Sequence, residues 1–141
     1  MKKLFPNETI VITNNFDVHH DWAVPIPAFF IIAAKRKIRS ISEFTPEEAE
    51  EFINLIIKLR KGMEEILNIK DVYFFQNEDT ESNFHLWIFP RHEWMENFGR
   101  KIQSVRPIME YAQENMANEE IFQEVKASVS KMKEYMGGFV K

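Results

Sequence analysis

The sequence contains no cysteine, and this absence excludes several kinds of site. Disulfide bonds, zinc sites with thiolate ligands and a cysteine nucleophile are all ruled out. Long apolar runs are missing as well, since none approaches the ~20 residues of a membrane-spanning helix. The opening "MKKLFPNETIVI" begins like a signal peptide, but Pro6, Asn7 and Glu8 interrupt its apolar part. We therefore expect a cytoplasmic protein without a membrane partner.

The sequence also lacks a surplus of positive charge. Its 18 Lys and Arg residues are outnumbered by 22 Asp and Glu residues, which gives a formal net charge of −4. A general basic surface for nucleic acid is therefore not expected. The one basic run is "KRKIR", residues 35–39, which is either a solvated turn or a small patch that attracts phosphate.

What the sequence does have is enough apolar residues for a core. Its 141 residues are 45% hydrophobic and 13% aromatic, which is typical of one globular domain. We expect a core of residues 1–95, followed by a helical extension of the same domain in residues 96–141. No repeat or linker divides the two parts.

Strand patterns and one strong helix pattern alternate along residues 1–95. Thr45, Pro46 and Glu48 form the start signal of a helix that we expect to run from 46 to about 68, with Gly62 tolerated at some cost. Strands are predicted at Thr9–Thr13, Ala28–Ala34, Val72–Gln76 and Phe84–Phe89. A strand within residues 17–27 would be short or at an edge, because that segment contains two prolines.

Two further helices are predicted after residue 96. Pro107 can open a helix that continues to about Met116, and Asn118 can cap another. The fold class is therefore α+β: an antiparallel sheet of about five strands, one long helix, and a C-terminal helical extension.

The stretch "NFHLWIFPRH", residues 83–92, carries the most distinctive pattern. Asn83, His85 and Trp87 share one face of the expected strand, because side chains alternate with a period of two. Taken by itself, a single histidine on such a strand has a structural or a functional interpretation. As a neutral imidazole, His85 could attack a phosphorus centre near neutral pH.

The order of these motifs resembles the histidine triad (HIT) superfamily of nucleotide hydrolases and transferases. That superfamily has a strand that ends in an "IPKRH"-like turn, a "LTPEE" helix, a "QN" pair, and a strand with three alternating histidines followed by "PR". Here the corresponding segments read "AAKRKIRSISEFTPEEAEEF" and "VYFFQN…FHLWIFPRH", within residues 8–92.

The resemblance implies a role for each matching residue. His85 matches the central histidine, the nucleophile that takes up a nucleotidyl group. Asn83 and Trp87 replace the flanking histidines. The other positions that match substrate-binding residues are Asp21, which matches the aspartate that holds the ribose hydroxyls, together with Lys37, Asn77 and Arg91.

The replaced histidines leave two functions open. One is a hydrolase or nucleotidyl transferase that cleaves phosphoanhydrides or phosphoramidates, similar to diadenosine-polyphosphate hydrolases. The other is a nucleotide-binding or regulatory protein that has lost turnover. If Trp87 fills the space of the leaving phosphate, His85 cannot attack in line; if the indole lies flat along the pocket, His85 stays usable.

A module for protein interaction through the C-terminal helices is a third interpretation.

Cofactors and partners follow from the same pattern. Glu78, Asp79 and Glu81 would repel a polyphosphate unless a divalent cation, or Lys37 and Arg91, offset them. No protein-bound metal site is predicted, since adjacent His19 and His20 would point to opposite faces of a strand. The expected partners are a nucleotide or nucleotide-derived small molecule and a second copy of the chain.

Overall fold

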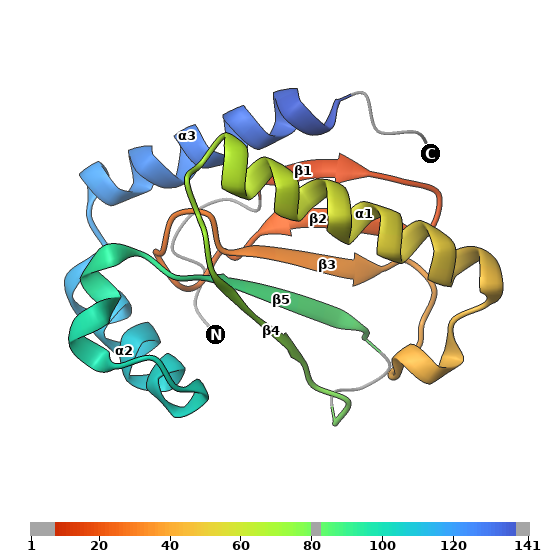
Figure 1. The fold of residues 1–141 in the computed structure, drawn as a ribbon, viewed down its shortest axis with the longest axis horizontal. Coiled ribbons are helices and arrows are strands. Elements are labelled where there is room, and N and C mark those ends of the chain that lie inside the picture. Colours follow the sequence, from red (N-terminus) through yellow and green to blue (C-terminus); the bar gives the residue numbers. More distant parts are fainter. Residues whose placement is uncertain (1–7, 80–82, 138–141) are drawn as a thin grey trace.

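A computed structural model describes residues 8–79 and 83–137. Residues 1–7, 80–82 and 138–141 lie outside the described residues, and with them Pro6, Asn7 and Glu81 of the sequence analysis. Its centre is an antiparallel sheet of five strands in the order β1-β2-β3-β5-β4. The strands are β1 (Thr9–Ile12), β2 (Phe16–His20), β3 (Phe30–Ala34), β4 (Val72–Gln76) and β5 (His85–Pro90). Figure 1 shows β1 and β4 at the two edges and β3 in the middle.

β2 is an internal strand, hydrogen-bonded to β1 on one side and β3 on the other. It is short, as expected, but it does not lie at an edge. The prolines that suggested an edge come after His20, in the loop that leads to β3. Because proline lacks an N–H group only at its own position, the strand before it pairs normally.

The long helix α1 (Pro46–Glu65) begins where the sequence predicts. The Thr45 hydroxyl accepts a hydrogen bond from the Glu48 N–H, and the Glu48 carboxylate accepts one from the Thr45 N–H, so both halves of the capping box form. The helix ends three residues earlier than expected, because Asn68 adopts a left-handed conformation with φ 59°. The Ile69 N–H then donates to the Met63 carbonyl and closes the helix end.

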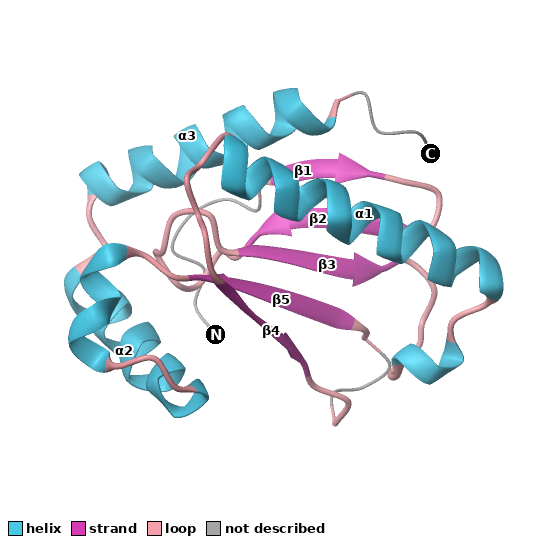
Figure 2. Cartoon of the chain, in the orientation of Figure 1, coloured by secondary structure: helices cyan, strands magenta, loops and turns pink. Residues whose placement is uncertain are grey.

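Helices α1 and α3 (Glu119–Met136) cover one face of the sheet, with α3 beside α1 and along β1 (Figures 1 and 2). The Asn118 side chain caps α3 by accepting from the Ile121 N–H, as predicted. Gly62 is where the two helices touch: a Cβ atom there would lie 2.6 Å from the Tyr135 ring. The larger core cluster lies beneath these helices and contains Phe16, Val18, Phe30, Ile32, Phe52, Leu55, Leu59, Phe84, Leu86, Ile88, Val129 and Met132.

The opposite face of the sheet is covered at one end only. After β5 the chain forms two short 3-10 helices, η2 (Glu93–Phe98) and η3 (Ile102–Ser104), and then α2 (Val105–Asn115). They enclose a smaller core cluster of Val24, Ile26, Phe29, Phe89, Met95, Val105, Ile108 and Ala112. α2 begins two residues before Pro107, because η3 leads into it without a break.

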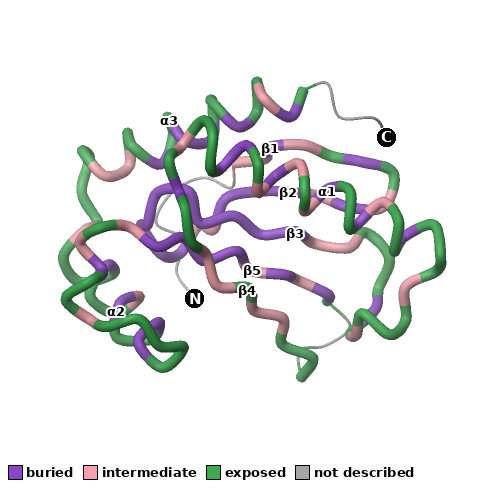
Figure 3. Tube along the Cα trace, in the orientation of Figure 1, coloured by how far each residue is buried: buried purple, intermediate pink, exposed green. Residues whose placement is uncertain are grey.

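The architecture is therefore α+β, as the sequence predicts. Figure 3 shows that buried residues are concentrated in the inner strands and that exposed residues lie on the outer sides of the helices. Within the part of the chain that the structure describes, no helix combines the length and apolar character needed to span a membrane.

Candidate functional site

A pocket of about 460 Å³ opens on the sheet face that α1 leaves free. The walls come from the turn after β2, from β3 and β5, and from α2, and the lining residues are Asp21, Trp22, Ala23, Val24, Ile31, Asn83, His85, Trp87 and Met109. Four of the predicted site residues, Asp21, Asn83, His85 and Trp87, therefore meet at one cavity. Trp22, which the sequence offered as a ring that stacks on a base or packs in the core, also lines the pocket, whereas Ala23, Val24, Ile31 and Met109 carry no local signal that distinguishes them from core residues.

His85 begins β5 and is half-buried in the pocket wall. Its Nδ1 atom lies 3.0 Å from the backbone carbonyl oxygen of Asn83. A carbonyl oxygen can only accept, so Nδ1 of the neutral ring must carry the proton in this contact. The other ring nitrogen, Nε2, then holds a lone pair. This is the tautomer that an imidazole nucleophile needs.

Trp87 lies next to His85 on the same strand face. The two ring centroids are 5.6 Å apart and the ring planes differ by 31°. Across the sheet Trp87 pairs with Ile31 on one side and Phe75 on the other. The indole is half-buried and contacts the smaller core cluster. With this shallow angle, Trp87 forms a wall of the pocket beside the imidazole.

Asp21 stands in the tight turn that follows β2. Its Oδ2 atom accepts hydrogen bonds from the N–H groups of Ala23, at 3.1 Å, and Val24, at 2.7 Å. Burial raises the pKa of the Asp21 carboxyl, and these two hydrogen bonds oppose that change. The carboxylate thus both closes the turn and lines the pocket.

His20 fixes the same turn from beneath. Its Nδ1 atom is 2.7 Å from the Asp21 carbonyl oxygen, and its Nε2 atom accepts from the Phe29 N–H at 3.3 Å. A ring nitrogen that accepts from an N–H group carries no proton, so the contact with Phe29 fits the neutral ring. Complete burial lowers the pKa of His20 to about 4, so it is uncharged at neutral pH. From the sequence, His20 was considered only as a possible metal ligand beside His19, so this role was missed.

Lys37 and Asn77 do not line the pocket. Lys37 is exposed in the loop after β3, and Asn77 is exposed after β4, where its Oδ1 atom accepts from the Asp79 N–H. Their loops meet, because the Gln76 side chain donates to the Arg39 carbonyl. Both residues therefore lie at the end of the sheet where the His85 strand begins.

The strand register points to another lysine near this end. Ala33 pairs with His85 across the sheet, so Lys35, two residues further along, lies opposite Asn83 if the register continues. Lys35 is exposed in the bend that follows β3, at the end of the sheet where β5 begins. The prediction from sequence chose Lys37 from the basic run and overlooked Lys35.

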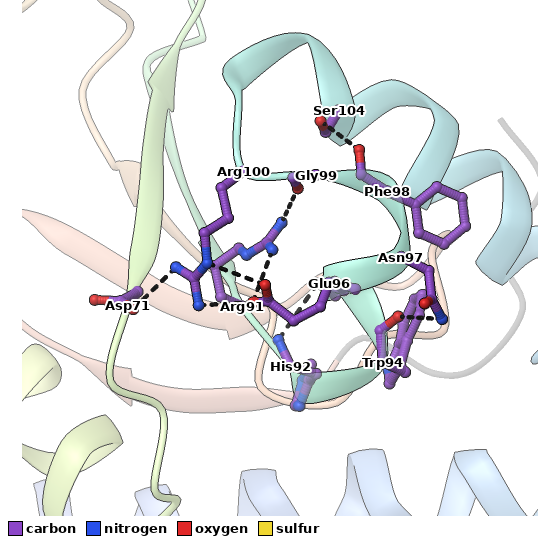
Figure 4. A network of polar contacts seen from close by, with 11 residues as sticks. Asp71, Arg91, His92, Trp94, Glu96, Asn97, Phe98, Gly99, Arg100 and Ser104 are labelled. Atoms are coloured by element: carbon purple, nitrogen blue, oxygen red, sulfur yellow. Dashed lines mark hydrogen bonds and ion pairs between the residues drawn. The ribbon is translucent and has the colours of Figure 1, made fainter.

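Arg91 lies away from the pocket. It follows the far end of β5, about 20 Å from His85 at ~3.3 Å per residue. Figure 4 shows its guanidinium donating to the Gly99 carbonyl, at 2.9 Å, and to the Glu96 carboxylate, at 3.2 Å. Glu96 also pairs with Arg100. The Arg91 side chain is only 3% exposed, so it ties η2 to the sheet instead of meeting the His85 pocket.

The remaining histidines, His19 and His92, are not among the described residues that line the pocket. His19 stacks on Trp22 with ring centroids 5.3 Å apart, and its Nδ1 atom is 3.4 Å from the Asp17 carboxylate. His92 contacts the Pro27 carbonyl through Nε2 at 2.6 Å, and burial lowers its pKa. Among residues 8–79 and 83–137, no three His, Asp or Glu side chains are grouped closely enough to hold a metal ion.

Few of the described side chains that line the pocket carry a charge. Among the described lining residues, Asp21 and His85 are the only side chains that ionise, and none is a lysine or arginine. Cations near the entrance come from the loop after β3, where Arg36 is already paired with Glu48. Lys35 and Lys37 are thus the candidates to meet a phosphate that lies beside Asn83 and His85.

Comparison with solved structures identifies the fold. A HIT-like protein from Bartonella henselae, described as involved in cell-cycle regulation, has a TM-score of 0.61 over 93% of this chain and 88% of its own, at 15% identity. A hypothetical histidine triad nucleotide-binding protein from Sulfolobus tokodaii has a TM-score of 0.59 over 97% and 93%, at 12% identity.

A zinc-bound histidine triad family protein from Mycobacterium smegmatis has a TM-score of 0.58 over 92% of this chain and 88% of its own, at 15% identity. No family model matches the sequence, and no curated protein matches it either. At identities this low, the structural similarity establishes the fold alone. The chemistry has to be argued from the residues that line the pocket. The chain has the histidine triad fold.

Proposed function

We propose that the protein is a nucleotide hydrolase or nucleotidyl transferase in which His85 is the nucleophile. The observation that carries this proposal is the contact between His85 Nδ1 and the Asn83 carbonyl, which leaves Nε2 unprotonated beside a pocket of about 460 Å³. A strand position, a fixed tautomer and an adjoining cavity are together what nucleophilic attack on a phosphorus centre requires.

The reaction has two steps. In the first, the lone pair of His85 Nε2 forms a bond to phosphorus, and the bond from phosphorus to the leaving oxygen or nitrogen breaks. The leaving group keeps that electron pair and takes up a proton. In the second, water, or an acceptor alcohol or amine, attacks the phosphorus and releases the imidazole. Splitting the reaction in this way replaces one difficult displacement with two easier ones.

The neighbouring groups have separate roles in this proposal. Asp21 accepts hydrogen bonds from the hydroxyls of the nucleoside. One of its oxygens, Oδ2, already closes the turn, so the other oxygen takes this role. Asn83 donates through its side-chain amide to a non-bridging oxygen. Lys35 and Lys37 supply the positive charge at the entrance, and a divalent cation brought with the substrate would add to it.

A specific observation favours a second candidate, a protein that binds nucleotide without turnover. Two of the three expected histidines are replaced, and no lysine or arginine is among the described residues that line the pocket. A transition state at phosphorus would then have few donors to stabilise its charge. Binding through Asp21 and the aromatic walls needs none of them.

A comparison of wild type with His85→Ala tests the first proposal. We expect nucleoside phosphoramidates, dinucleoside polyphosphates and nucleotide sugars to reveal a substrate, and His85→Ala to lower kcat by at least about a thousandfold. The affinity of the variant for the nucleotide should stay within about tenfold of wild type. A covalent nucleotidyl adduct, trapped by denaturation at alkaline pH, where a phosphorus–nitrogen bond to histidine survives, and detected by mass spectrometry, should form on wild type only.

Rebuilding the triad separates the two candidates. An enzyme adapted to its own pocket should lose activity, or change substrate, when Asn83→His and Trp87→His are combined. A binding protein should instead gain turnover from near zero. If wild type turns over no substrate while the rebuilt triad is active, the enzyme proposal fails and the binding proposal stands.

We further propose that two copies of the chain associate through the free edge of the sheet. β4 is an edge strand that pairs only with β5 within the described sheet, and Phe74 on it is 47% exposed. On the outer side of α1, Ile53 and Ile57 are also about half exposed, at 52% and 47%. An open strand edge with apolar side chains is a natural pairing surface for a second copy.

A further inference from the structure

Beside the His85 pocket lies a second hollow of about 440 Å³, between β4 and α2. Its apolar lining comes from Phe75, Ile102, Val105 and Met109. Met109 lines the His85 pocket as well, so one side chain stands between the two hollows. We call the second hollow the annex.

The sheet register independently places the two hollows next to each other. Trp87, in the wall of the His85 pocket, pairs directly across the sheet with Phe75, in the wall of the annex. Both rings belong to the face that α2 covers in part. On the α2 side, the half-buried side chain of Met109 is the described residue that lines both cavities. Methionine is unbranched and flexible, so it can move aside without a change of backbone.

The backbone on both sides of Met109 is held in place. Four residues further along α2, the Gln113 side chain donates to the Ala23 carbonyl at 3.3 Å and fastens the helix to the turn after Asp21. One turn before Met109, Val105 is buried in the smaller core cluster. The helix is thus held on both sides of the dividing residue.

The annex is poorly suited to phosphate. The cation at its rim, Arg106, is already paired with Glu110 at 3.4 Å. The rest of the described lining is uncharged, with Gln113 as its other polar member. A second nucleotide joined through several phosphates would bring negative charges to a wall without a free counter-charge. An apolar group would gain about fourfold in affinity for each methylene that it buries there.

We propose that the pocket and the annex form one cleft, gated by Met109, whose substrate is a nucleoside monophosphate with a bulky apolar leaving group. This inference rests on the proposed function, since it assigns the leaving group of the same reaction. Asp21 lies on the side of the nucleoside, and the leaving group extends past Met109 toward Phe75. His85 Nε2 bonds to phosphorus, and the phosphorus–oxygen or phosphorus–nitrogen bond to the apolar group breaks. The departing group takes a proton, and water then hydrolyses the histidine adduct.

The test is a series of esters of one nucleoside 5′-monophosphate with methyl, phenyl and naphthyl leaving groups. Because the esters also differ in leaving-group pKa, the readout is the naphthyl-to-methyl ratio of kcat/KM in each variant, relative to that ratio in wild type. Met109→Ala should raise this ratio about tenfold, and Met109→Phe should lower it by a similar factor. Met116→Ala is the matched control, since Met116 contacts the same core cluster but lines neither hollow.

Each outcome decides one point. If the ratio is unchanged within about twofold in both Met109 variants, with folding verified by thermal unfolding and by Met109→Leu, the annex has no part in the reaction. If Met109→Ala instead changes the preference between purine and pyrimidine bases, the annex holds the base and the assignment of the leaving group is overturned. Turnover of the methyl ester without any dependence on size leaves the proposed function intact, whereas neither turnover nor nucleotide binding in wild type overturns both.

Discussion

Replacing His20 by glutamine should reduce the acid sensitivity of the fold. In the native state the Nδ1–H group of His20 donates to the Asp21 carbonyl, and Nε2 accepts from the Phe29 N–H. Protonation of Nε2 would place two N–H groups against each other, in a site without access to water. The neutral ring is therefore strongly preferred in the folded chain, and the charged ring in the unfolded chain below its ordinary pKa.

The magnitude follows from the two pKa values. Burial lowers the pKa of His20 from 6.5 to about 4. At 1.36 kcal/mol for each pKa unit, this difference corresponds to about 3 kcal/mol. Because the unfolded state binds the extra proton, stability is fully present above pH 6.5, decreases as the pH falls, and has lost that amount at about pH 4.

Urea denaturation at half-unit steps from pH 7 to pH 4 measures the effect. Wild type should lose about 3 kcal/mol more of its unfolding free energy across this range than His20→Gln. His92→Gln is the matched control: burial also lowers the pKa of His92, but it is less enclosed, so this variant should keep most of the slope. Parallel pH curves for wild type and His20→Gln, or a ring that titrates near pH 6.5 in NMR spectra, would refute the assignment.

Three other changes test the fold around the site. Gly62→Ala should cost about 1–3 kcal/mol of stability in urea, because its Cβ atom would meet the Tyr135 ring at 2.6 Å; an equal stability would mean that α3 shifts freely. Arg91→Met should lower the melting temperature by removing the hydrogen bonds from Arg91 to the Gly99 carbonyl and the Glu96 carboxylate, yet leave nucleotide affinity unchanged; weaker nucleotide binding would return Arg91 to the site. Phe74→Arg should convert a dimer to a monomer in sedimentation experiments at micromolar concentration, and a dimer that persists would exclude the β4 edge.

The elements with local signals were predictable from the sequence. The capping box at Thr45 and Glu48 places the start of α1 correctly, because each partner lies within one helical turn of the other. The end of the helix was misplaced because apolar spacing continues through Leu67, while the left-handed Asn68 closes the helix after Glu65. Nothing in the spacing of apolar residues reveals that conformation.

The site was predictable only as far as the strand extends. Asn83, His85 and Trp87 meet at one pocket, because the period of two fixes the face of every residue along a strand. That rule stops where the chain leaves the sheet. Arg91 comes after Pro90 and turns into the network around η2, and Lys37 comes after the last paired residue of β3. The walls from the turn after β2 and from α2 depend on tertiary packing, which no local pattern encodes.

The backbone beside His85 bears on the two residues that stand where the resemblance places the flanking histidines. The group that fixes the tautomer of His85 is the carbonyl oxygen of Asn83, which every amino acid at that position would provide. Replacing histidine by asparagine there removes an imidazole but keeps the acceptor that leaves Nε2 free. Trp87, in contrast, replaces a polar ring with an apolar wall that continues into Phe75 and the annex. In this chain the central histidine of the pattern is retained and the residue beside it is an apolar ring, which is the arrangement that the proposed apolar leaving group would need.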